Sequence, residues 1–409
     1  MKKKAEPSSA QYWERTIPEY HVSANVFKVL SGLQKAGFIA YLVGGGVRDL
    51  LVGKIPKDFD IATDAAPEQV RKIFRNSRNI GRRFRIVHVF YRQEIIEVTT
   101  FRAQISESAI TLDPHSRVEN NTFGTVEEDA WRRDFTVNSL YYDNKKKVVL
   151  DFTGGMNDLE KKLIRIIGDP AQRFHEDPVR LLRAIRLSAK LQFNIHEETA
   201  AELSKLQHLL KHVAESRLFD EMLKLFFTGH ALVTYKKLYE FQYLSALFPA
   251  TYQAIHTADA AQIHRFIELA MQETDRRYHE QDSLNPGFLL AVLLWPALQA
   301  ALSQHSIKKL NFALRKAIDE ILQKQAENLV IPNRLTAMMR SIWLLQYYLI
   351  RPRAKRVYRT LFHRYFRAAF DFLSLRVRAG EHQHQAALDW WSKFREADGN
   401  VRQQMLEEL

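Results

Sequence analysis

The chain of 409 residues contains no cysteine at all. This excludes a disulfide framework, a thiolate zinc site and a cysteine nucleophile. Acidic residues are also scarce relative to basic ones, 47 against 60, which gives a formal net charge of +13 and a pI near 9.6. The charge favours an anionic partner, with nucleic acid the first candidate. Hydrophobic residues make up 46% of the chain, so it can bury cores and is not a disordered protein.

Long hydrophobic runs are missing as well. The basic start Met1–Lys4 is not followed by an apolar region, so it does not match a signal peptide. The stretch Ser283–Ile307 has no charged residue, but its strongly apolar part, Phe288–Leu298, is short and ends around Pro296. A membrane-spanning helix needs about 20 apolar residues, so this stretch is predicted to be a buried core helix. The chain is expected to be soluble and cytoplasmic, with no membrane partner.

The character of the chain changes near residue 155. Strand-like and helix-like patterns alternate before this point, and helical patterns dominate after it. This predicts an α+β protein, with a small mixed sheet and helices in an N-terminal head, followed by an all-α neck and body. The predicted segments are a basic polar extension (1–20), the head (21–155), the helical neck (156–230) and the helical body (231–409).

The expected elements follow from periodicity, caps and stop signals. In the head we expect helices over 24–36, from Val47 onward, over 67–74 and over 129–141, and strands over 39–43, 59–63, 86–91, 94–99 and 148–152. Beyond the head we expect helices over 178–191, 197–210, 215–227 and most of 260–405.

A glycine turn lies between the first buried strand and the helix after it, in the run Leu42-Val-Gly-Gly-Gly-Val-Arg-Asp49. Gly44 and Gly45 let the backbone approach an anion, and the new helix offers free N–H groups and the positive end of its dipole. Arg48 adds a charged fork suited to a phosphate. The plainer interpretation is an ordinary strand–helix turn with a surface arginine.

Two carboxylates follow about ten residues later, in Asp58-Phe59-Asp60. Residues i and i+2 of a strand point to the same face, so the two carboxylates would lie side by side. Like charges at that separation favour a cation between them, and hard oxygen ligands suit Mg²⁺. Asp58 and Asp60 are therefore predicted metal ligands. A solvated acidic turn is the alternative, and for this short motif taken alone it is the commoner one.

The combination is more specific than either motif, because metal-dependent nucleotidyl transfer needs a phosphate site beside a carboxylate pair. The two motifs in this order resemble the class II nucleotidyltransferases of the DNA polymerase β-like superfamily. These include the tRNA CCA-adding enzymes and the bacterial poly(A) polymerases. Three further segments match in register: Arg132-Arg-Asp-Phe-Thr-Val-Asn138, Asp151-Phe-Thr-Gly-Gly155 and Arg173-Phe-His-Glu-Asp-Pro-Val-Arg180.

The resemblance implies roles for these segments. Asp134 corresponds to a member of the family's catalytic set, with Asp58 and Asp60. On the helix expected over 129–141, Arg133 and Asn138 would face the nucleotide, while Val137, Leu140 and Tyr141 pack inward. Glu97 is a rival third carboxylate, because its strand is expected to neighbour the Asp58 strand. A salt bridge with Arg102 or a nearby lysine is the alternative for Glu97.

The helix after Pro178 carries an arginine stripe. At about 100° per residue, Arg180, Arg183 and Arg186 share one arc, and Leu181 and its apolar neighbours lie opposite. In the family, the residues that match Asp177 and Arg180 act as a protein template for the incoming base. Asp177, Arg180 and Arg183 are therefore predicted nucleotide-binding residues, against the alternative of a basic surface helix. How adenine is chosen over cytosine stays open.

Three features favour a poly(A) polymerase over a CCA-adding enzyme. Ile80-Gly-Arg-Arg-Phe-Arg-Ile-Val-His88 resembles a stretch of the bacterial poly(A) polymerases, and the surrounding segment 71–92 is basic with no acidic residue. This predicts RNA binding at Arg82, Arg83 and Arg85. A second basic segment, 351–367, is interleaved with aromatics that either stack bases or form core. The sequence contains no His-Asp dipeptide, so a phosphohydrolase domain of the kind appended to some CCA-adding enzymes is not indicated.

The predicted function is template-independent addition of AMP from ATP to RNA 3′ ends. Mg²⁺ (or Mn²⁺) would be the cofactor, and no haem, flavin or zinc is expected. RNA 3′ ends and ATP are the expected partners. A CCA-adding enzyme is the nearer alternative, and a non-catalytic RNA-binding protein on a decayed transferase fold is the remote one. Protein partners and oligomeric state are not predicted.

Overall fold

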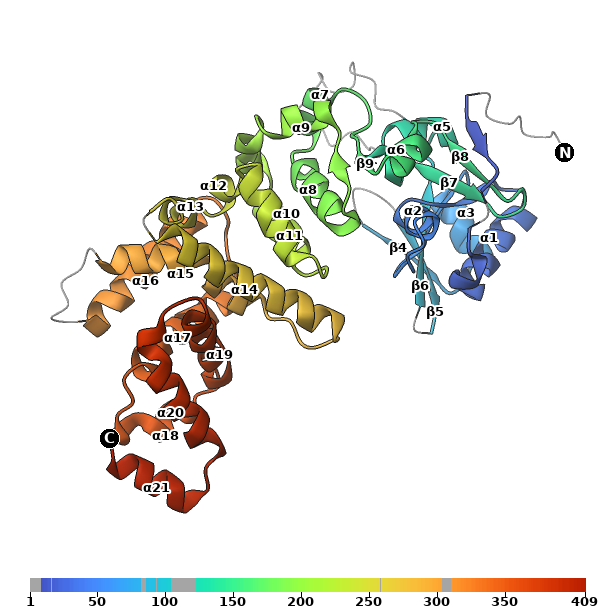
Figure 1. Cartoon of the computed structure of the whole chain (residues 1–409). Helices are drawn as coiled ribbons and strands as arrows, with labels where there is room; N and C mark the ends of the chain where they lie inside the picture. The colour runs from blue at the N-terminus through green and yellow to red at the C-terminus, as the bar shows by residue number, and fades with distance from the viewer. Residues whose placement is uncertain are drawn as a thin grey trace. The chain divides into compact units, whose positions relative to one another are not determined.

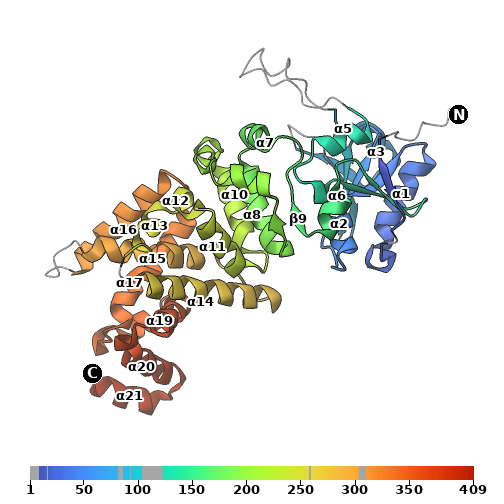
Figure 2. The ribbon, with the colours of Figure 1, turned by 45° about the horizontal axis from the view of Figure 1, so that its top comes forward.

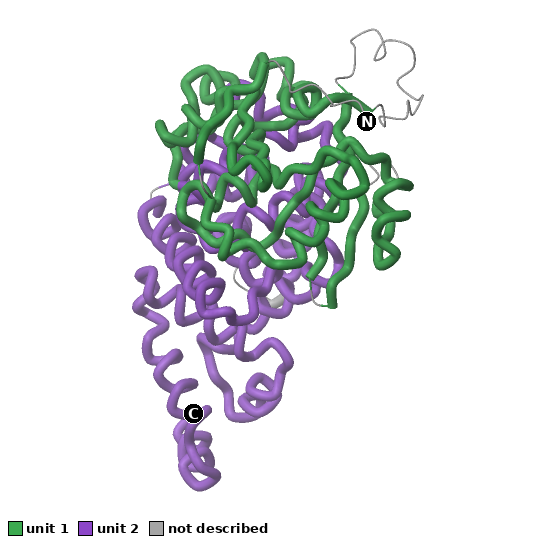
Figure 3. Tube along the Cα trace, turned by 90° about the vertical axis from the view of Figure 1, so that its right-hand side faces the viewer, with its two compact units in different colours: residues 1–176, 192–202 green, residues 177–191, 203–409 purple. Residues whose placement is uncertain are grey.

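The computed structural model describes residues 9–15, 17–81, 86–92, 94–103, 123–257, 259–303 and 310–409. The chain divides into two compact units (Figure 3), the first formed by residues 1–176 and 192–202, and the second by residues 177–191 and 203–409. The strands belong to the first unit, and the described part of the second unit is helical (Figure 1). This is the predicted α+β head with a helical body.

A mixed eight-stranded sheet forms the first unit, in the order β1-β8-β7-β2-β3-β6-β5-β4. Neighbours are antiparallel, except that β3 and β6 run parallel. The strands are β1 (Gln11–Trp13), β2 (Ala40–Val43), β3 (Asp60–Thr63), β4 (Ser77–Ile80), β5 (Ile86–Tyr91), β6 (Glu94–Thr100), β7 (Leu140–Asp143) and β8 (Val148–Asp151). A separate parallel pair joins β9 (Leu163–Ile164) and β10 (Asn194–Ile195).

The helices of the first unit are short. They are η1 (Glu19–His21), α1 (Ala24–Lys35), α2 (Gly45–Leu51), α3 (Pro67–Ile73), α5 (Val126–Trp131), η2 (Thr136–Asn138), α6 (Gly155–Glu160), α7 (Pro170–Glu176) and most of α9 (Glu197–Leu203). Ser23 caps α1 as predicted, with its side chain accepting from the Val26 N–H. Val126 and Ala130 of α5 pack on Tyr41 and Tyr141 of the sheet, so this helix is held by a buried apolar cluster.

The prediction of one helix over 129–141 is wrong. Helix α5 ends at Trp131, and the chain then forms η2 and strand β7. The backbone around Phe135 pairs instead with the segment at Ile166: Thr136 N donates to Arg165 O at 3.0 Å, and Ile167 N donates to Asp134 O at 3.0 Å. Asp134 also bonds its own neighbour's N–H, the local competition that makes Asp a weak helix former.

Other boundaries also differ from the sequence pattern. Gln11–Trp13 of the expected extension adds β1 to the edge of the sheet beside β8. Helix α2 begins at Gly45 and not at Val47. The helix expected over 197–210 is two elements, α9 and η3 (Gln207–His212). The expected neck is shared between the units, with residues 156–176 and 192–202 in the first and the rest in the second.

The second unit contains the remaining helices. They are α8 (Val179–Leu191), η3, α10 (Glu215–Phe226), α11 (Ala231–Glu240), α12 (Tyr243–Leu247), α13 (Pro249–Ala254), α14 (Ala260–His279), α15 (Pro286–Ser303), α16 (Leu310–Ala326), α17 (Asn333–Leu349), η5 (Ala354–Arg356), α18 (Val357–Leu361), α19 (Phe366–Arg378), η6 (His382–His384), α20 (Gln385–Glu396) and α21 (Gly399–Glu407). Helix α14 runs beside α15 (Figure 2).

Helix α15 is, among the described residues, the one helix long and apolar enough to cross a membrane. Of its residues, 61% are buried inside the protein, so it serves as the predicted core helix. Pro296 lies inside the helix and does not end it. The indole N–H of Trp343 on α17 donates to the Ala291 carbonyl oxygen of α15 at 3.1 Å.

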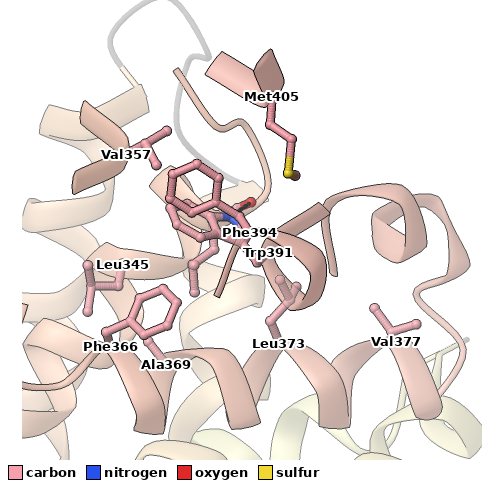
Figure 4. Close-up of a cluster of buried hydrophobic side chains, with 10 residues drawn as sticks. Leu345, Val357, Phe366, Ala369, Leu373, Val377, Trp391, Phe394 and Met405 are labelled. Carbon is pink, nitrogen blue, oxygen red and sulfur yellow. Dashed lines mark hydrogen bonds between the residues drawn. The ribbon is translucent and has the colours of Figure 1, made fainter. Parts of the chain in front are cut away.

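A buried cluster holds the C-terminal helices together (Figure 4). Trp391 and Phe394 of α20 lie at its centre and contact residues of α17, α18 and α19. The Trp391 indole donates to the Leu349 carbonyl oxygen at 3.0 Å, so its buried polar atom is satisfied. This core fixes α18, whose Val357 is buried in the cluster.

Candidate active site

The glycine turn sits where β2 ends and α2 begins. Gly44 has a φ of +77°, a conformation that favours glycine. A methyl group on Gly44 would lie 3.4 Å from Arg133 Nη1 and 3.6 Å from Asp60 Oδ2. The backbone of the turn therefore lies against both a guanidinium and a carboxylate, and a bare Cα keeps that space open.

The next glycines bring α2 close to the acidic motif. A methyl group on Gly46 would meet the Phe59 ring at 3.2 Å and the Asp58 carbonyl oxygen at 3.3 Å. Phe59 is buried behind the motif, as predicted. The strand itself begins at Asp60, so Asp58 lies in the exposed turn before it. Sheet register adds Glu97 of β6, which is the direct partner of Asp60 on β3.

These carboxylates are electrostatically crowded. Burial raises the pKa of Asp60 to about 6, helped by repulsion from Glu97 and Asp58 and opposed by attraction to Arg133. Glu97 Oε1 lies 3.3 Å from His88 Nε2, whereas the alternative interpretation of Glu97 named Arg102 or a lysine as its partner. In the described part of the chain, no three His, Asp or Glu side chains form a metal-holding group. Asp58 and Asp60 offer two carboxylates, a kind of donor that hard divalent cations take together with water and phosphate oxygens.

Arg133 is fixed before any ligand arrives. Its Nε donates to Tyr141 Oη at 2.9 Å, its Nη2 donates to Asp129 Oδ2 at 3.2 Å, and its guanidinium lies over the Tyr141 ring. The Tyr141 hydroxyl donates in turn to Asp129 at 2.7 Å. Attraction to Tyr141, Asp129 and Asp60 keeps the pKa of Arg133 above its ordinary value despite burial. The cation therefore has a single orientation, with Nη1 near Gly44.

A second chain of hydrogen bonds runs through Arg48, which is only 4% exposed. Its Nε donates to Asp49 at 2.8 Å, and its Nη1 donates to the Asn138 side-chain oxygen. The Asn138 amide nitrogen donates to Asp134 Oδ1 at 3.2 Å. Arg48 lies against Gly45, 3.4 Å from a methyl group placed there. Asp134 therefore acts on the turn through Asn138 and Arg48, a connection that the expected helix did not show.

Two supporting residues of this site were missed as such in the sequence, although both lie in recognised motifs. Arg173 Nη2 donates to the carbonyl oxygens of Arg132 at 2.8 Å and Arg133 at 2.6 Å, so it holds the bend before Asp134. Asp151 is buried and accepts from four successive backbone N–H groups at the start of α6. In the sequence, an Asp shortly before two glycines at the start of a helix is the signal that could have revealed this cap.

The predicted nucleotide-selecting residues lie in the second unit, on and before α8. Asp177 Oδ1 accepts from the Val179 N–H at 3.3 Å, and Arg217 of α10 donates to Asp177 Oδ2 at 2.7 Å. Arg186 donates to the buried Glu221 of α10 at 2.8 Å. Arg180 and Arg183 are half-buried on the predicted arc, and the opposite apolar face is buried. Helix α10 thus contacts Asp177 and Arg186, which lie before and after Arg180 and Arg183 in the sequence.

The predicted RNA-binding residues Arg82, Arg83 and Arg85 lie outside the described residues. The C-terminal basic segment is among the described residues, and its aromatic side chains are partly buried and partly exposed. Phe366 is core, whereas Tyr358 and Phe362 are exposed.

Three family models match the chain. They are the poly A polymerase head domain over residues 40–165, the probable RNA and SrmB-binding site of polymerase A over 192–255, and the polymerase A arginine-rich C-terminus over 306–409. Poly(A) polymerase I of Escherichia coli O157:H7 is 43% identical over 406 residues, which cover 97% of this chain and 87% of that protein. The chain belongs to the bacterial poly(A) polymerase family.

Other relatives set the limits of this membership. Poly(A) polymerase I of Haemophilus influenzae is 38% identical over 94% of the chain. The CCA-adding enzyme of Lactobacillus helveticus is also 38% identical, but over only 53% of this chain and 52% of its own length. Similarity to the CCA-adding enzymes is thus strong over about half of the chain, whereas similarity to the poly(A) polymerases covers nearly all of it.

Solved structures share the fold. The Thermotoga maritima CCA-adding enzyme complexed with tRNA has a TM-score of 0.64 at 21% identity, covering 95% of this chain and 88% of that one. The Bacillus stearothermophilus enzyme in complex with CTP has a TM-score of 0.60 at 24% identity, covering 90% and 81%. The chain is a nucleotidyltransferase, and membership in the poly(A) polymerase family implies a nucleotide substrate and a divalent metal ion.

Proposed function

We propose that this protein is a template-independent polynucleotide adenylyltransferase that adds AMP from ATP to RNA 3′ ends in the cytoplasm. The similarity to poly(A) polymerase I over 97% of the chain carries this proposal. The site agrees with it, because a carboxylate pair lies beside a glycine turn bordered by two oriented arginines. That is the arrangement in which the RNA hydroxyl attacks the α-phosphorus of ATP and pyrophosphate leaves.

Asp58 and Asp60 would hold the divalent ion, Mg²⁺ or in its place Mn²⁺, because carboxylate oxygens suit both ions. When bound, this ion would neutralise the carboxylates and polarise the phosphate oxygens. The chain's own contribution is positioning. Arg133 and Arg48 present fixed cations at Gly44 and Gly45, where the triphosphate would approach the backbone. Since their orientations are set by internal partners, no reorganisation is needed when negative charge develops.

The structure supports different roles for the two rival carboxylates. Glu97 neighbours Asp60 and raises the pKa of Asp60. Its negative charge would therefore act on the ion held by Asp58 and Asp60. Asp134 instead bonds Asn138 and the backbone of Phe135. We assign Glu97 to the surroundings of the metal, and Asp134 to positioning Asn138 and Arg48 for the nucleotide.

Asp177, Arg180 and Arg183 would select the nucleotide. A carboxylate and a guanidinium fork offer an acceptor and donors to the edge of a base. Arg217 bonds Asp177 and so restricts the orientation of the Asp177 carboxylate. A fixed orientation is one way in which Asp177 and Arg180 could favour adenine over cytosine. A CCA-adding activity remains the second candidate, supported by the relatives that match about half of the chain.

The test uses purified protein, labelled RNA, ATP and Mg²⁺. The wild type should extend the RNA with AMP. Asp58→Ala and Asp60→Ala should abolish extension, with RNA affinity within about threefold of the wild type, because the carboxylates act on the metal and not on the RNA strand. If both variants keep full activity, the site assignment is wrong. A wild type that binds RNA but never extends it would indicate the decayed, non-catalytic alternative.

A further inference from the structure

The surface around α18 is strongly basic. No acidic residue occurs from Asn328 through Phe370. The basic side chains at its centre are exposed and make no ion pair with any described residue; they are Arg351, Arg353, Lys355, Arg356 and Arg359. Elsewhere in this unit arginines are commonly paired, as Arg277 is with Glu273 and Arg340 with Asp319. Uncompensated cations side by side cost free energy, and their arrangement favours an anionic ligand.

Three of these arginines surround a pocket. Arg351, Arg353 and Arg356 line it, with Tyr348, Thr360 and the buried Trp391 forming the rest of its wall. The Arg356 guanidinium lies over the Tyr348 ring, 5.2 Å from its centroid, which holds that side chain at the pocket. Arginines that line one hollow can offer forked N–H donors to the oxygens of a phosphate group.

Two exposed aromatic rings lie at α18, Tyr358 within the helix and Phe362 directly after its last residue. Tyr358 and Phe362, one helical turn apart, are stacked with 6.0 Å between centroids and 12° between planes. Tyr358 also meets the ring of the buried Phe394 edge-on at 5.8 Å, which ties the stack to the core of Figure 4. Phe362 is 75% exposed at the outer end. A large apolar ring held this way offers its open surface to another planar group.

We propose that the α18 surface is a binding site for single-stranded RNA, with a phosphate in the Arg351/Arg353/Arg356 pocket and a base stacked on Phe362. This rests on the proposed function in one respect: the strand bound here would be the RNA that is extended. Phosphate-binding arginines beside a stacking ring form the usual combination for single strands, because a base can reach the ring only when it is unpaired. The charge selects the backbone, and the ring is indifferent to sequence.

The first test measures binding of a fluorescent 12-nucleotide oligo(A) in EDTA without ATP, so catalysis plays no part. Phe362→Ala should weaken binding about tenfold, the loss of one base stack. Phe362→Trp should bind oligo(A) as the wild type does, because tryptophan also offers a ring for stacking. Phe312→Ala is the matched control, because Phe312 is 68% exposed on the separate helix α16. The Phe362→Ala defect should vanish with an abasic oligomer of the same length.

The second test separates the pocket from general charge. Affinity falls as salt rises, and the slope of log affinity against log salt is negative. Arg353→Gln and Arg356→Gln should each make this slope shallower, by about 0.7 for each phosphate that the protein no longer neutralises. Arg334→Gln, which removes an exposed arginine of α17, should leave the slope nearly unchanged. Circular dichroism and melting would verify that each variant is folded.

The proposal is overturned if Phe362→Ala binds oligo(A) as Phe312→Ala does, or if its defect persists with the abasic oligomer. An equal loss for a blunt RNA duplex would also overturn it, because a duplex offers no unpaired base. Extension assays are run separately on the same variants. If the wild type fails to add AMP, the proposed activity is refuted. The binding site is still supported in that case if Phe362→Ala loses oligo(A) affinity and Phe312→Ala does not.

Discussion

Asp60 on β3 stands directly opposite Glu97 on β6 in the one parallel ladder among the described strands of the eight-stranded sheet. Repulsion from Glu97 and Asp58, added to burial, raises the pKa of Asp60 to about 6, although Arg133 lies nearby. The folded protein therefore carries electrostatic strain at the point where we propose that a cation binds. Strain of this kind is expected at functional sites, because stability there is sacrificed for binding.

Asp60→Asn should stabilise the metal-free protein. The folded pKa of Asp60 lies above its ordinary value of 3.8, so the native state holds the extra proton between these pH values and loses stability as pH rises through about 6. In EDTA at pH 8, the head of the variant should melt a few degrees above the wild type, corresponding to about 1–2 kcal/mol.

The control for this prediction is the pH dependence itself. The difference in Tm should shrink at pH 5, and added Mg²⁺ should stabilise the wild type but not the variant. Equal melting temperatures at both pH values would show that Asp60 is not repelled by its neighbours.

Asp134→Ala and Asn138→Ala should act through one network. Each removes a link to Arg48, so each is expected to raise KM for ATP about tenfold, with a smaller effect on kcat. Because the links are in series, the double variant should be little worse than either single one. Steady-state kinetics on all three variants measure this. Fully additive losses would mean that Asp134 contacts substrate or metal independently of Asn138.

Gly155→Ala should unfold or strongly destabilise the head. A methyl group at this position would lie 2.2 Å from the Thr136 carbonyl oxygen, a backbone atom that cannot move aside cheaply. Gly399→Ala is the matched control, since nothing lies within 4 Å and the residue begins helix α21. Thermal melts should show a loss of several degrees or no folded protein for Gly155→Ala, and a change near zero for Gly399→Ala. Similar melting temperatures for both would contradict the close packing of α6 on η2.

Arg217→Ala should loosen nucleotide selection. Without its partner at 2.7 Å, Asp177 gains rotamers that suit more than one base edge. The ratio of kcat/KM for ATP to that for CTP should fall about threefold to tenfold, while RNA affinity stays unchanged. Arg276→Ala is a control, because it removes an arginine of another helix that pairs with Glu273. An unchanged ratio in Arg217→Ala would mean that Asp177 is oriented by other contacts.

Features governed by local rules could be predicted from the sequence. The cap at Ser23, the glycine turn at Gly44 and the arc of Arg180 and Arg183 depend on residues only a few positions apart. The helix over 129–141 failed because backbone pairing with the segment at Ile166 overrides its periodicity. Arg173 and Arg217 act across 40 residues, which no local pattern reveals. Helical spacing also could not separate the buried Phe366 from the exposed Phe362.

The preference for adenine and for RNA 3′ ends of any sequence can be measured in one assay. Purified protein with Mg²⁺ is given ATP or CTP, and either a generic single-stranded RNA or a tRNA that lacks its 3′ end. A poly(A) polymerase should make long tails from ATP on both primers and incorporate little CTP. Incorporation of CTP, with addition that stops after three nucleotides on the tRNA, would contradict it and identify a CCA-adding enzyme.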